Sequence, residues 1–533
     1  MKYLVRAKWV VEAGPNVLTD GAVLVDGERI AEVGDWGDLR RRFDNVPVYG
    51  GDRYALLPGL VNAHHHSAGV TSIAQAIPDR ALEPWLLSLA SGRPADPALE
   101  TKIAAARQLR SGITRVVDVH QGAGTYEEFH EGVEARLEAY RETGIRAALA
   151  VGVAERSFLV AGEDRKFLAS LPDPLRELAE RRLPGPEAIS TEEYFESMRT
   201  HFNRWRDHSR VSLWFGPPGP QWVHDETLVR MGEVSSETGM NIQTHLEESV
   251  YEKFAGPRMT GRRVVEHLDT LGVLGPRFSC AHGVWLSDTE IELLAARGAA
   301  ISHNPSSNLR LRSGIAPLNA LIAAGVTTGI GLDGTTMNDN DDMWQEMRLA
   351  LRLHRTPGID GPAPEPDDIF ALATTFGAAL YGGAAPGGEV GSRAATANAG
   401  AAWYARGPSS AATIADGAIA TGAQADLVLL DITRITRPWV APEVDPLSLL
   451  VYRASASDVD SVFVGGRRVV EDGRVLTMDE PALEAELADE LAAQRVPEAN
   501  ERTVRELMPY VEAWYRNWKQ PGLTPRTTYN SRD

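Results

Sequence analysis

The sequence predicts an α/β fold with a parallel sheet, open or closed into a barrel, and a second, β-rich domain. Between residue 58 and about residue 385, strand-like apolar runs alternate with helix-like segments, the pattern of repeated βαβ units. Polar residues follow these apolar runs, where a barrel carries its functional groups. Short β-like runs fill both ends of the chain, and this shared texture predicts that the two ends pair with each other.

The two β-rich ends are expected to form one discontinuous domain from residues 1–57 and 414–478, with residues 58–413 inserted between them. Hairpin turns are indicated at Asp26-Gly27, Gly465-Gly466 and Asp472-Gly473. The β-like runs of this domain span residues 3–11, 22–25, 30–33, 425–431 and 459–476.

The inserted region begins with the apolar run that ends in three histidines and continues with a helix at 101–110 and a strand at 113–120. A long, charged helical stretch with its own loops then extends to about residue 210. The alternation of strands and helices resumes through residues 211–217, 240–245, 277–282, 292–304 and 320–334.

Two further segments lie outside this pattern. Residues 387–408 are rich in Gly, Ala and Ser, which predicts an irregular insertion or a lid. Residues 479–533 predict a helical C-terminal extension, whose second helix carries Met508, Val511 and Tyr515 near helical spacing. Such a face packs against the parent fold or against a second subunit.

Composition and charge exclude several classes of protein. The net charge of -19, from 73 acidic and 54 basic residues, argues against nucleic acid or an anionic membrane as a partner. The single cysteine, Cys280, excludes an intrachain disulfide and fits a reducing cytoplasm. Arg6 and Lys8 interrupt the N-terminal apolar run, and no window approaches the roughly 18 apolar residues of a membrane helix. We expect a cytoplasmic enzyme with a small-molecule substrate.

The stretch LLPGLVNAHHHSAG, residues 56–69, is the strongest indication of a metal site. Successive side chains of a strand point to opposite faces, so His64 and His66 share one face. Two imidazoles on one face provide half of a metal site. The alternative is that the histidine cluster is a surface accident, which further ligands at other strand ends would argue against.

Further polar residues do follow later apolar runs. His245 is either a metal ligand or a hydrogen-bonded core residue, and Glu248 lies near enough to reach the same pocket. Asp333 is either a ligand or a helix cap. Three histidine nitrogens and one carboxylate suit zinc or a similar divalent ion. The other residues at strand ends are His120, His282 and His303.

Five motifs in order resemble the amidohydrolase superfamily, in its branch of cytosine and guanine deaminases and triazine chlorohydrolases. They are PGLVNAHHH, QTHLEE, CAHGVWL, SHNPSSNLRLRSG and GLDGTTMNDNDDM. The resemblance covers roughly residues 1–478. It implies a distorted (β/α)8 TIM barrel with a discontinuous β-sandwich-like domain built from both chain ends. The remote alternative of an inactive scaffold protein would fit a chain that had lost a ligand.

The resemblance also assigns roles to the residues of these motifs. It implies one divalent metal ion per chain, most often Zn²⁺ with Fe²⁺, Co²⁺ or Mn²⁺ as alternatives, and two metals would require a lysine at the end of the fourth strand, which VSLWFGPPGPQW lacks. Glu248 becomes the proton donor and His282 orients the attacking water, while Asp333 also accepts its proton. The implied metal ligands are His64, His66, His245 and Asp333.

The implied reaction is hydrolysis of a carbon–nitrogen bond, with an aminated heterocycle as the expected substrate and an acyclic amide, urea or carbamate as the alternative. The arginine that binds the purine carbonyl in related guanine deaminases is absent after the fourth strand, which argues against a purine and favours the acyclic alternative. The resemblance and the C-terminal helix suggest a homodimer or higher homo-oligomer. Candidate substrate contacts are Gln75, Trp85, His120, Gln221, Trp222 and His303.

Overall fold

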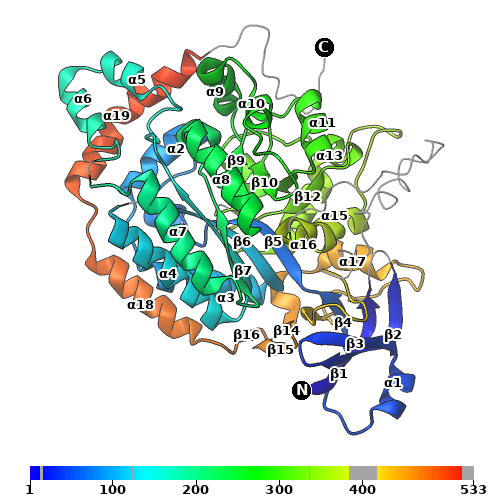
Figure 1. Ribbon diagram of the computed structural model, residues 1–533. Helices are drawn as coiled ribbons and strands as arrows, with labels where there is room; N and C mark the ends of the chain where they lie inside the picture. Colours follow the sequence, from blue (N-terminus) through cyan, green and yellow to red (C-terminus); the bar gives the residue numbers. More distant parts are fainter. Residues whose placement is uncertain (13–15, 123, 186, 335, 383–416, 519–533) are drawn as a thin grey trace.

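The structure is a computed structural model that describes residues 1–12, 16–122, 124–185, 187–334, 336–382 and 417–518. Figure 1 shows a large barrel surrounded by helices and a smaller sheet at one side, which contains the N-terminus. The insertion expected at residues 387–408 and the last part of the C-terminal extension lie outside the described residues.

Eight parallel strands form the barrel, with neighbours paired in chain order from β5 to β12. The apolar runs of the sequence therefore do fold as a (β/α)8 barrel, as predicted. The strands are β5 (Leu60–His65), β6 (Ile113–Gly122), β7 (Arg146–Val153), β8 (Val211–Phe215), β9 (Ile242–Leu246), β10 (Phe278–His282), β11 (Ala300–His303) and β12 (Thr327–Ile330).

The barrel is distorted at two seams. Strands β8 and β9 pair only through Phe215 and Ile242 in the described ladder. Strands β12 and β5 stand at the two ends of the strand order and touch each other, and just beyond β12 the backbone nitrogen of Asp333 donates to the carbonyl of His64 at 2.9 Å. The second seam therefore brings a carboxylate directly beside a histidine.

One strand was missed by the sequence analysis. Strand β7, RAALAVGV, lies inside the segment that was expected to be helical up to about residue 210. Three of its eight residues are alanine, the strongest helix former, so local propensity favours a helix over the observed strand. The strand is buried on both faces, and a fully buried parallel strand lacks the alternation of polar and apolar residues that identifies other strands.

Helices surround the barrel and cover its carboxyl end (Figure 1). Several begin with side-chain caps; Thr125 and Ser190, for example, form capping boxes with Glu128 and Glu193. The helices of this region are α2 (Leu82–Ser88), α3 (Pro97–Arg110), α4 (Tyr126–Thr143), α5 (Asp164–Ser170), α6 (Asp173–Glu180), α7 (Thr191–Trp205), α8 (Asp225–Thr238), α9 (Val250–Thr260), α10 (Val264–Thr270), α11 (Asp288–Arg297), α12 (Pro305–Arg310), α13 (Leu318–Ala323), α14 (Met343–Leu353), α15 (Pro366–Leu372) and α16 (Thr375–Gly382).

The two chain ends form a second sheet, as the sequence predicted. Its strand order is β16-β15-β14-β13-β4-β1-β2-β3, and the ends meet where β4 pairs antiparallel with β13. Short helices α1 (Trp36–Arg42) and α17 (Pro446–Arg453) belong to the same chain segments. The strands are β1 (Lys2–Val11), β2 (Val17–Asp26), β3 (Arg29–Asp35), β4 (Val48–Pro58), β13 (Leu427–Asp431), β14 (Val459–Val464), β15 (Arg467–Glu471) and β16 (Arg474–Val475).

A buried carboxylate joins the second sheet to the barrel. Asp426, just before β13, accepts hydrogen bonds from Arg146 Nε at 2.8 Å and Arg115 Nε at 3.2 Å, and both arginines lie at the start of barrel strands. Burial raises the pKa of Asp426, but the two guanidinium charges outweigh this and keep its pKa below the ordinary value. Removal of this carboxylate would remove the negative charge that balances two buried guanidinium groups.

The C-terminal extension is helical, as predicted, and packs on its own barrel. Helix α18 (Glu480–Ala493) lies against α3, and α19 (Glu498–Arg516) lies against α2 and α6. The apolar face of α19, including Met508, Val511 and Tyr515, is buried among residues of α5, α6 and α9. No helix in the described part of the chain is long and apolar enough to cross a membrane.

Candidate metal centre

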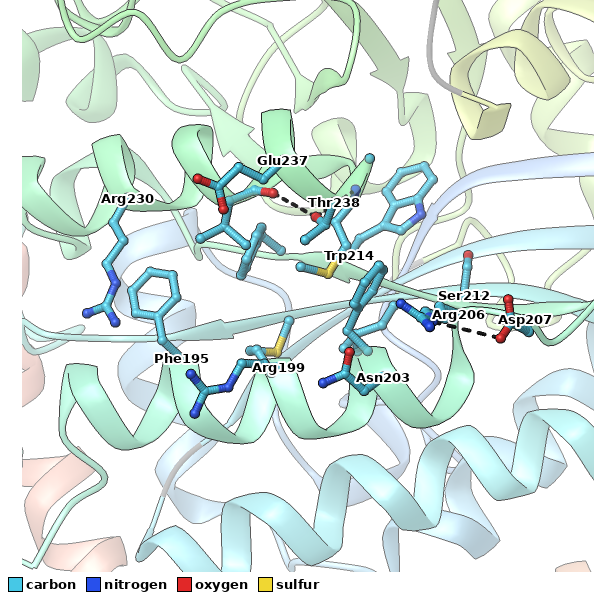
Figure 2. A pocket seen from close by; sticks show the side chains of 17 residues that line it. Phe195, Arg199, Asn203, Arg206, Asp207, Ser212, Trp214, Arg230, Glu237 and Thr238 are labelled. Atoms are coloured by element: carbon cyan, nitrogen blue, oxygen red, sulfur yellow. Dashed lines mark hydrogen bonds and ion pairs between the residues drawn. The ribbon is translucent and has the colours of Figure 1, made fainter.

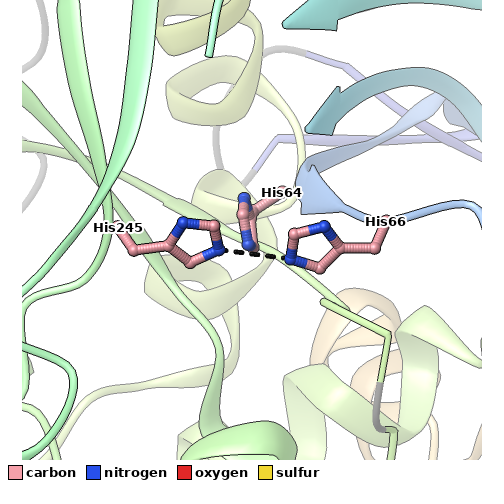
Figure 3. Close-up of side chains that lie close together, drawn as sticks. All are labelled: His64, His66 and His245. Atoms are coloured by element: carbon pink, nitrogen blue, oxygen red, sulfur yellow. Dashed lines mark hydrogen bonds between the residues drawn. The ribbon is translucent and has the colours of Figure 1, made fainter. Parts of the chain in front are cut away.

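Three histidines converge at the carboxyl end of the barrel (Figure 3). His64 and His66 come from the end of β5, and His245 comes from β9 on the other side of the barrel. The imidazoles of His66 and His245 are stacked at a centroid distance of 5.2 Å, and His64 stands at right angles to both. The side chains of His64 and His66 therefore lie on the same side of β5, as the alternation along a strand predicts.

Each of these histidines donates its Nδ1 proton away from the cluster. His66 donates to the carbonyl of Val119 at 2.7 Å, and His245 donates to the carbonyl of Pro218 at 2.7 Å. His64 Nδ1 lies 3.0 Å from the amide oxygen of Gln243. Because a neutral imidazole carries one proton, these bonds leave the Nε2 lone pairs free to face one another.

The free lone pairs fit a metal ion. The Nε2 atoms of His66 and His245 are 3.2 Å apart, and Nε2 of His64 is buried with no hydrogen-bond partner among the described residues. Two unprotonated nitrogens at this distance repel each other unless a cation lies between them, and zinc binds histidine nitrogen at about 2.0–2.1 Å. Asp333 Oδ1 lies 3.3 Å from His66 Nε2 and 3.7 Å from His64 Nε2.

Burial and charge give these groups the protonation states of metal ligands. Burial, reinforced by His66 and His282, lowers the pKa of His245 to about 3. Burial also holds the pKa of His64 well below its ordinary value. Burial alone would raise the pKa of Asp333, but the neighbouring histidines, His66 first, outweigh it and lower that pKa. Neutral imidazoles and an ionised carboxylate are the forms that bind a divalent cation.

Asp333 is held in place by its backbone and by Ser307. It adopts a positive φ of 54°, which is uncommon for a residue other than glycine. The hydroxyl of Ser307 donates to its Oδ2, and the backbone nitrogen of Gly334 donates to its Oδ1 at 2.8 Å. The strained backbone and these two bonds aim the carboxylate at the histidines.

Glu248 and His282 lie beside the cluster. His282 also has a positive φ, of 76°, and its Nδ1 donates to Asn308 Oδ1 at 2.9 Å, so that Nε2 faces Glu248 Oε2 at 3.5 Å. Ser313 donates to Glu248 Oε1 at 3.0 Å. Burial and the negative charges of Glu252 and Asp333 raise the pKa of Glu248 well above its ordinary value. A neutral carboxyl of this kind is suited to donate a proton.

A buried carboxylate that the sequence analysis missed supports Glu248. Glu252 accepts a hydrogen bond from the backbone nitrogen of Glu248 at 2.6 Å and another from Gln221 Nε2 at 2.7 Å. Gln221 thus stabilises, through Glu252, the loop that carries Glu248. Glu252 is four residues beyond the predicted proton donor, on the first turn of α9, and the sequence alone does not show which groups it contacts.

The remaining predicted substrate contacts take different positions. Gln75 accepts a hydrogen bond from the backbone nitrogen of Arg93 at 2.6 Å, while the indole nitrogens of Trp85 and Trp222 are buried without a described partner. His303 Nε2 faces His354 Nε2 at 2.9 Å. That contact favours a structural role for His303, and substrate binding by these residues stays a prediction.

His120 lies on β6, on the strand face opposite to Val119. Burial, with the charges of Arg136 and His66, keeps the pKa of His120 well below its ordinary value. The residue is half-buried near the end of the strand. Its predicted contact with substrate also stays a prediction.

A separate cavity of about 900 Å³ lies against β8 between α7 and α8, as Figure 2 shows. Phe195, Met198 and Trp214 contribute apolar surface, and Arg199 and Arg206 lie at its edge. Its lining includes none of the residues of the metal centre. It is therefore distinct from the site at the carboxyl end of the barrel.

Comparisons with known proteins agree with this geometry. The model of the amidohydrolase family matches residues 55–395, and that of the bacterial imidazolonepropionase-like composite domain matches residues 21–44. The 5'-deoxyadenosine deaminase of Methanopyrus kandleri is 31% identical over 482 residues, which are 87% of this chain and 93% of the relative. The 5-methylthioadenosine/S-adenosylhomocysteine deaminase of Thermodesulfovibrio yellowstonii is 27% identical over 90% of this chain and 96% of its own length.

Solved structures show the same fold. The zinc-bound adenosine deaminase from Xanthomonas campestris has a TM-score of 0.73 and 27% identity, covering 92% of this chain and 99% of that structure. The zinc complex of atrazine chlorohydrolase from Arthrobacter aurescens has a TM-score of 0.73 at 22% identity, covering 92% and 100%. The predicted resemblance and the predicted class, a hydrolase of carbon–nitrogen bonds other than peptide bonds, are confirmed, and this chain belongs to the amidohydrolase family.

Proposed function

We propose that this protein is a zinc-dependent deaminase of an aminated heterocycle, with an adenine nucleoside as the substrate class. The observation that carries the proposal is the cluster of three Nε2 atoms, from His64, His66 and His245, with the Asp333 carboxylate 3.7 Å and 3.3 Å from the first two and a buried glutamic acid of raised pKa nearby. The printed names of the relatives, which include 5'-deoxyadenosine deaminase, support the substrate class.

His64, His66, His245 and Asp333 would hold one divalent ion. When bound, the ion supplies the Lewis acidity that makes water a nucleophile near neutral pH. Zinc suits three imidazole nitrogens and one carboxylate, and the zinc-bound structural relative supports it. A single ion is supported by β8, whose sequence VSLWF contains no lysine.

Different residues around the histidine cluster accept and donate the protons of the reaction. Asp333 is ionised and accepts the proton of the attacking water, while His282 accepts a hydrogen bond from that water at Nε2, because its Nδ1 proton is held by Asn308. Glu248 donates its proton to the ring nitrogen next to the carbon under attack. The tetrahedral carbon then collapses as the amino group takes up the proton that Asp333 accepted and leaves as ammonia, while the proton of the new hydroxyl group returns to Glu248.

The remaining features of the proposal follow from the sequence and from packing. We place the enzyme in the cytoplasm, which suits a chain whose only cysteine, Cys280, is buried and free. A homo-oligomer remains part of the proposal, although the apolar face of α19 already packs on its own barrel. The scaffold alternative is disfavoured because all four ligands and both proton-handling residues lie together.

The test combines elemental analysis with an activity assay. The purified protein, loaded with zinc, is incubated with adenosine, 5'-deoxyadenosine and 5'-methylthioadenosine, and released ammonia is measured. We expect about one zinc per chain, its loss in Asp333→Ala, and a fall in kcat of about 10²- to 10⁴-fold in Glu248→Gln with zinc retained. Wild-type protein that binds zinc but releases no ammonia would contradict the proposed substrate class.

A further inference from the structure

The amide of Gln121 lies at the mouth of the barrel without a hydrogen-bond partner. Both Oε1 and Nε2 of this side chain are buried, and neither has a partner among the described residues. Buried amide groups are nearly always hydrogen-bonded in folded proteins, because desolvation without a partner costs free energy. Two such atoms on one side chain leave the Gln121 amide free to bond a ligand in the site.

Gln121 points into the barrel, toward the metal centre. Side chains alternate along β6, and Val117 and Val119 belong to the apolar cluster that fills the barrel interior together with Ala148 and Ala150. Gln121 follows Val119 on the same face, one step nearer to the carboxyl end of the strand. Active sites of this barrel type lie at that end.

The contacts of β6 place Gln121 two residues beyond a carbonyl that binds His66. The carbonyl of Val119, two residues earlier, accepts the Nδ1 proton of His66 at 2.7 Å. On the other side, Gln121 is the register partner of Gly152 on β7, and a Cβ built on Gly152 would lie 2.9 Å from Gln121 Oε1. The amide therefore extends over a residue without a side chain, between β7 and the cluster.

We infer that Gln121 determines substrate specificity by hydrogen-bonding an aminated heterocycle through both atoms of its carboxamide. An adenine ring presents its amino N–H next to the N7 acceptor, on the edge away from the ring nitrogen that Glu248 would protonate, and this edge is the complement of an amide oxygen and nitrogen. Glutamine makes the same two-bond contact with adenine in protein–nucleic acid complexes. The inference rests on the proposed function and identifies Gln121 as the residue that recognises the heterocyclic ring of the substrate.

The test compares wild type with Gln121→Met and Gln121→Glu, all loaded with zinc. Methionine preserves the length and volume of the side chain but removes both hydrogen bonds, and glutamate preserves the shape and one acceptor. Adenosine, 5'-methylthioadenosine, guanine and cytosine are the substrates. Zinc content and the melting temperature show that each variant is folded, and Gln494→Met, at the end of α18, is the matched control.

We expect Gln121→Met to raise KM about tenfold or more for each substrate that wild type accepts, with kcat changed less than about threefold. Gln121→Glu should give a smaller rise in KM and replaces the methionine variant if that one does not fold. Unchanged KM in both variants would overturn the role of Gln121 and leave the deaminase proposal standing. A zinc-loaded wild type that releases ammonia from none of the four substrates would overturn both.

Discussion

The backbone nitrogen of Glu248 donates a 2.6 Å hydrogen bond to Oε2 of Glu252, so one buried carboxylate fixes the loop that carries the proposed proton donor. The other oxygen of Glu252 accepts from Gln221, which follows β8. The carboxylate therefore ties the loops after β8 and β9 together beside the metal centre. Its surroundings give several predictions about activity and stability.

Replacement of Glu252 by glutamine should displace Glu248. An amide offers one acceptor oxygen, so one of the two donors, Glu248 N or Gln221 Nε2, would face an NH₂ group, and an unsatisfied buried donor costs about 1–3 kcal/mol. We expect kcat to fall about tenfold, with zinc content unchanged. Steady-state kinetics measure the effect, and Glu237→Gln on the exposed face of α8 is the control. A kcat equal to that of wild type would refute a positioning role for Glu252.

Glu83 on α2 should make stability depend on pH. Burial, reinforced by Glu252, raises its pKa from 4.5 to about 8. Below pH 4.5 the group is protonated in both the folded and the unfolded protein. Between pH 4.5 and about 8 the unfolded chain loses this proton first, so the free energy of unfolding falls as the pH rises.

The Glu83→Gln variant removes this titration while keeping an acceptor for the Ser249 hydroxyl. Urea unfolding at several pH values should show a shallower decline in the free energy of unfolding than in wild type, by up to about 1.4 kcal/mol per pH unit. Glu486→Gln, at an exposed position on α18, should leave the decline unchanged. Identical slopes for wild type and Glu83→Gln would show that Glu83 titrates normally.

Ser307 should increase the affinity for the metal ion although it is not one of the proposed ligands. Its hydroxyl donates to Asp333 Oδ2, and loss of such a supporting bond typically weakens metal binding by about 10- to 100-fold. Competition with a zinc chelator measures the affinity of Ser307→Ala, with Ser236→Ala on the exposed surface of α8 as the control. Equal affinities in all three proteins would mean that Asp333 is held sufficiently by its backbone.

Tyr515 should anchor the C-terminal helix. Its hydroxyl accepts a buried 2.8 Å hydrogen bond from the backbone nitrogen of Ala161, in the loop after β7. Tyr515→Phe leaves that donor unsatisfied, and we expect the free energy of unfolding to fall by about 1–2 kcal/mol. Denaturant unfolding measures it against Tyr510→Phe, since Tyr510 lies on the same helix and is 37% exposed. If both variants lose equal stability, this hydrogen bond contributes nothing specific.

Prediction from sequence succeeded where a short apolar run is followed directly by a polar residue. The apolar runs before His64, His245 and Asp333 are short, and each is followed by a polar group, so both the strand and the polar side chain at its end were visible. It failed for β7, whose alanines favour a helix in isolation and form a strand only because neighbours on both sides and helices outside bury them. Gln121 and Glu252 were missed because a lone polar residue carries no sign of its partners.

The sequence pattern by itself determined the parallel-sheet class, the pairing of both chain ends and the residue types of the candidate metal centre, because strand periodicity and ligand chemistry are local properties. The closed barrel followed from the resemblance to a known family. Only the tertiary structure decided which atoms meet. The 3.2 Å approach of His66 to His245 joins residues on opposite sides of the barrel, and Asp333, whose charge helps to raise the pKa of Glu248, is distant from it in sequence. Such distances and desolvation arise when the barrel closes, and no local pattern contains them.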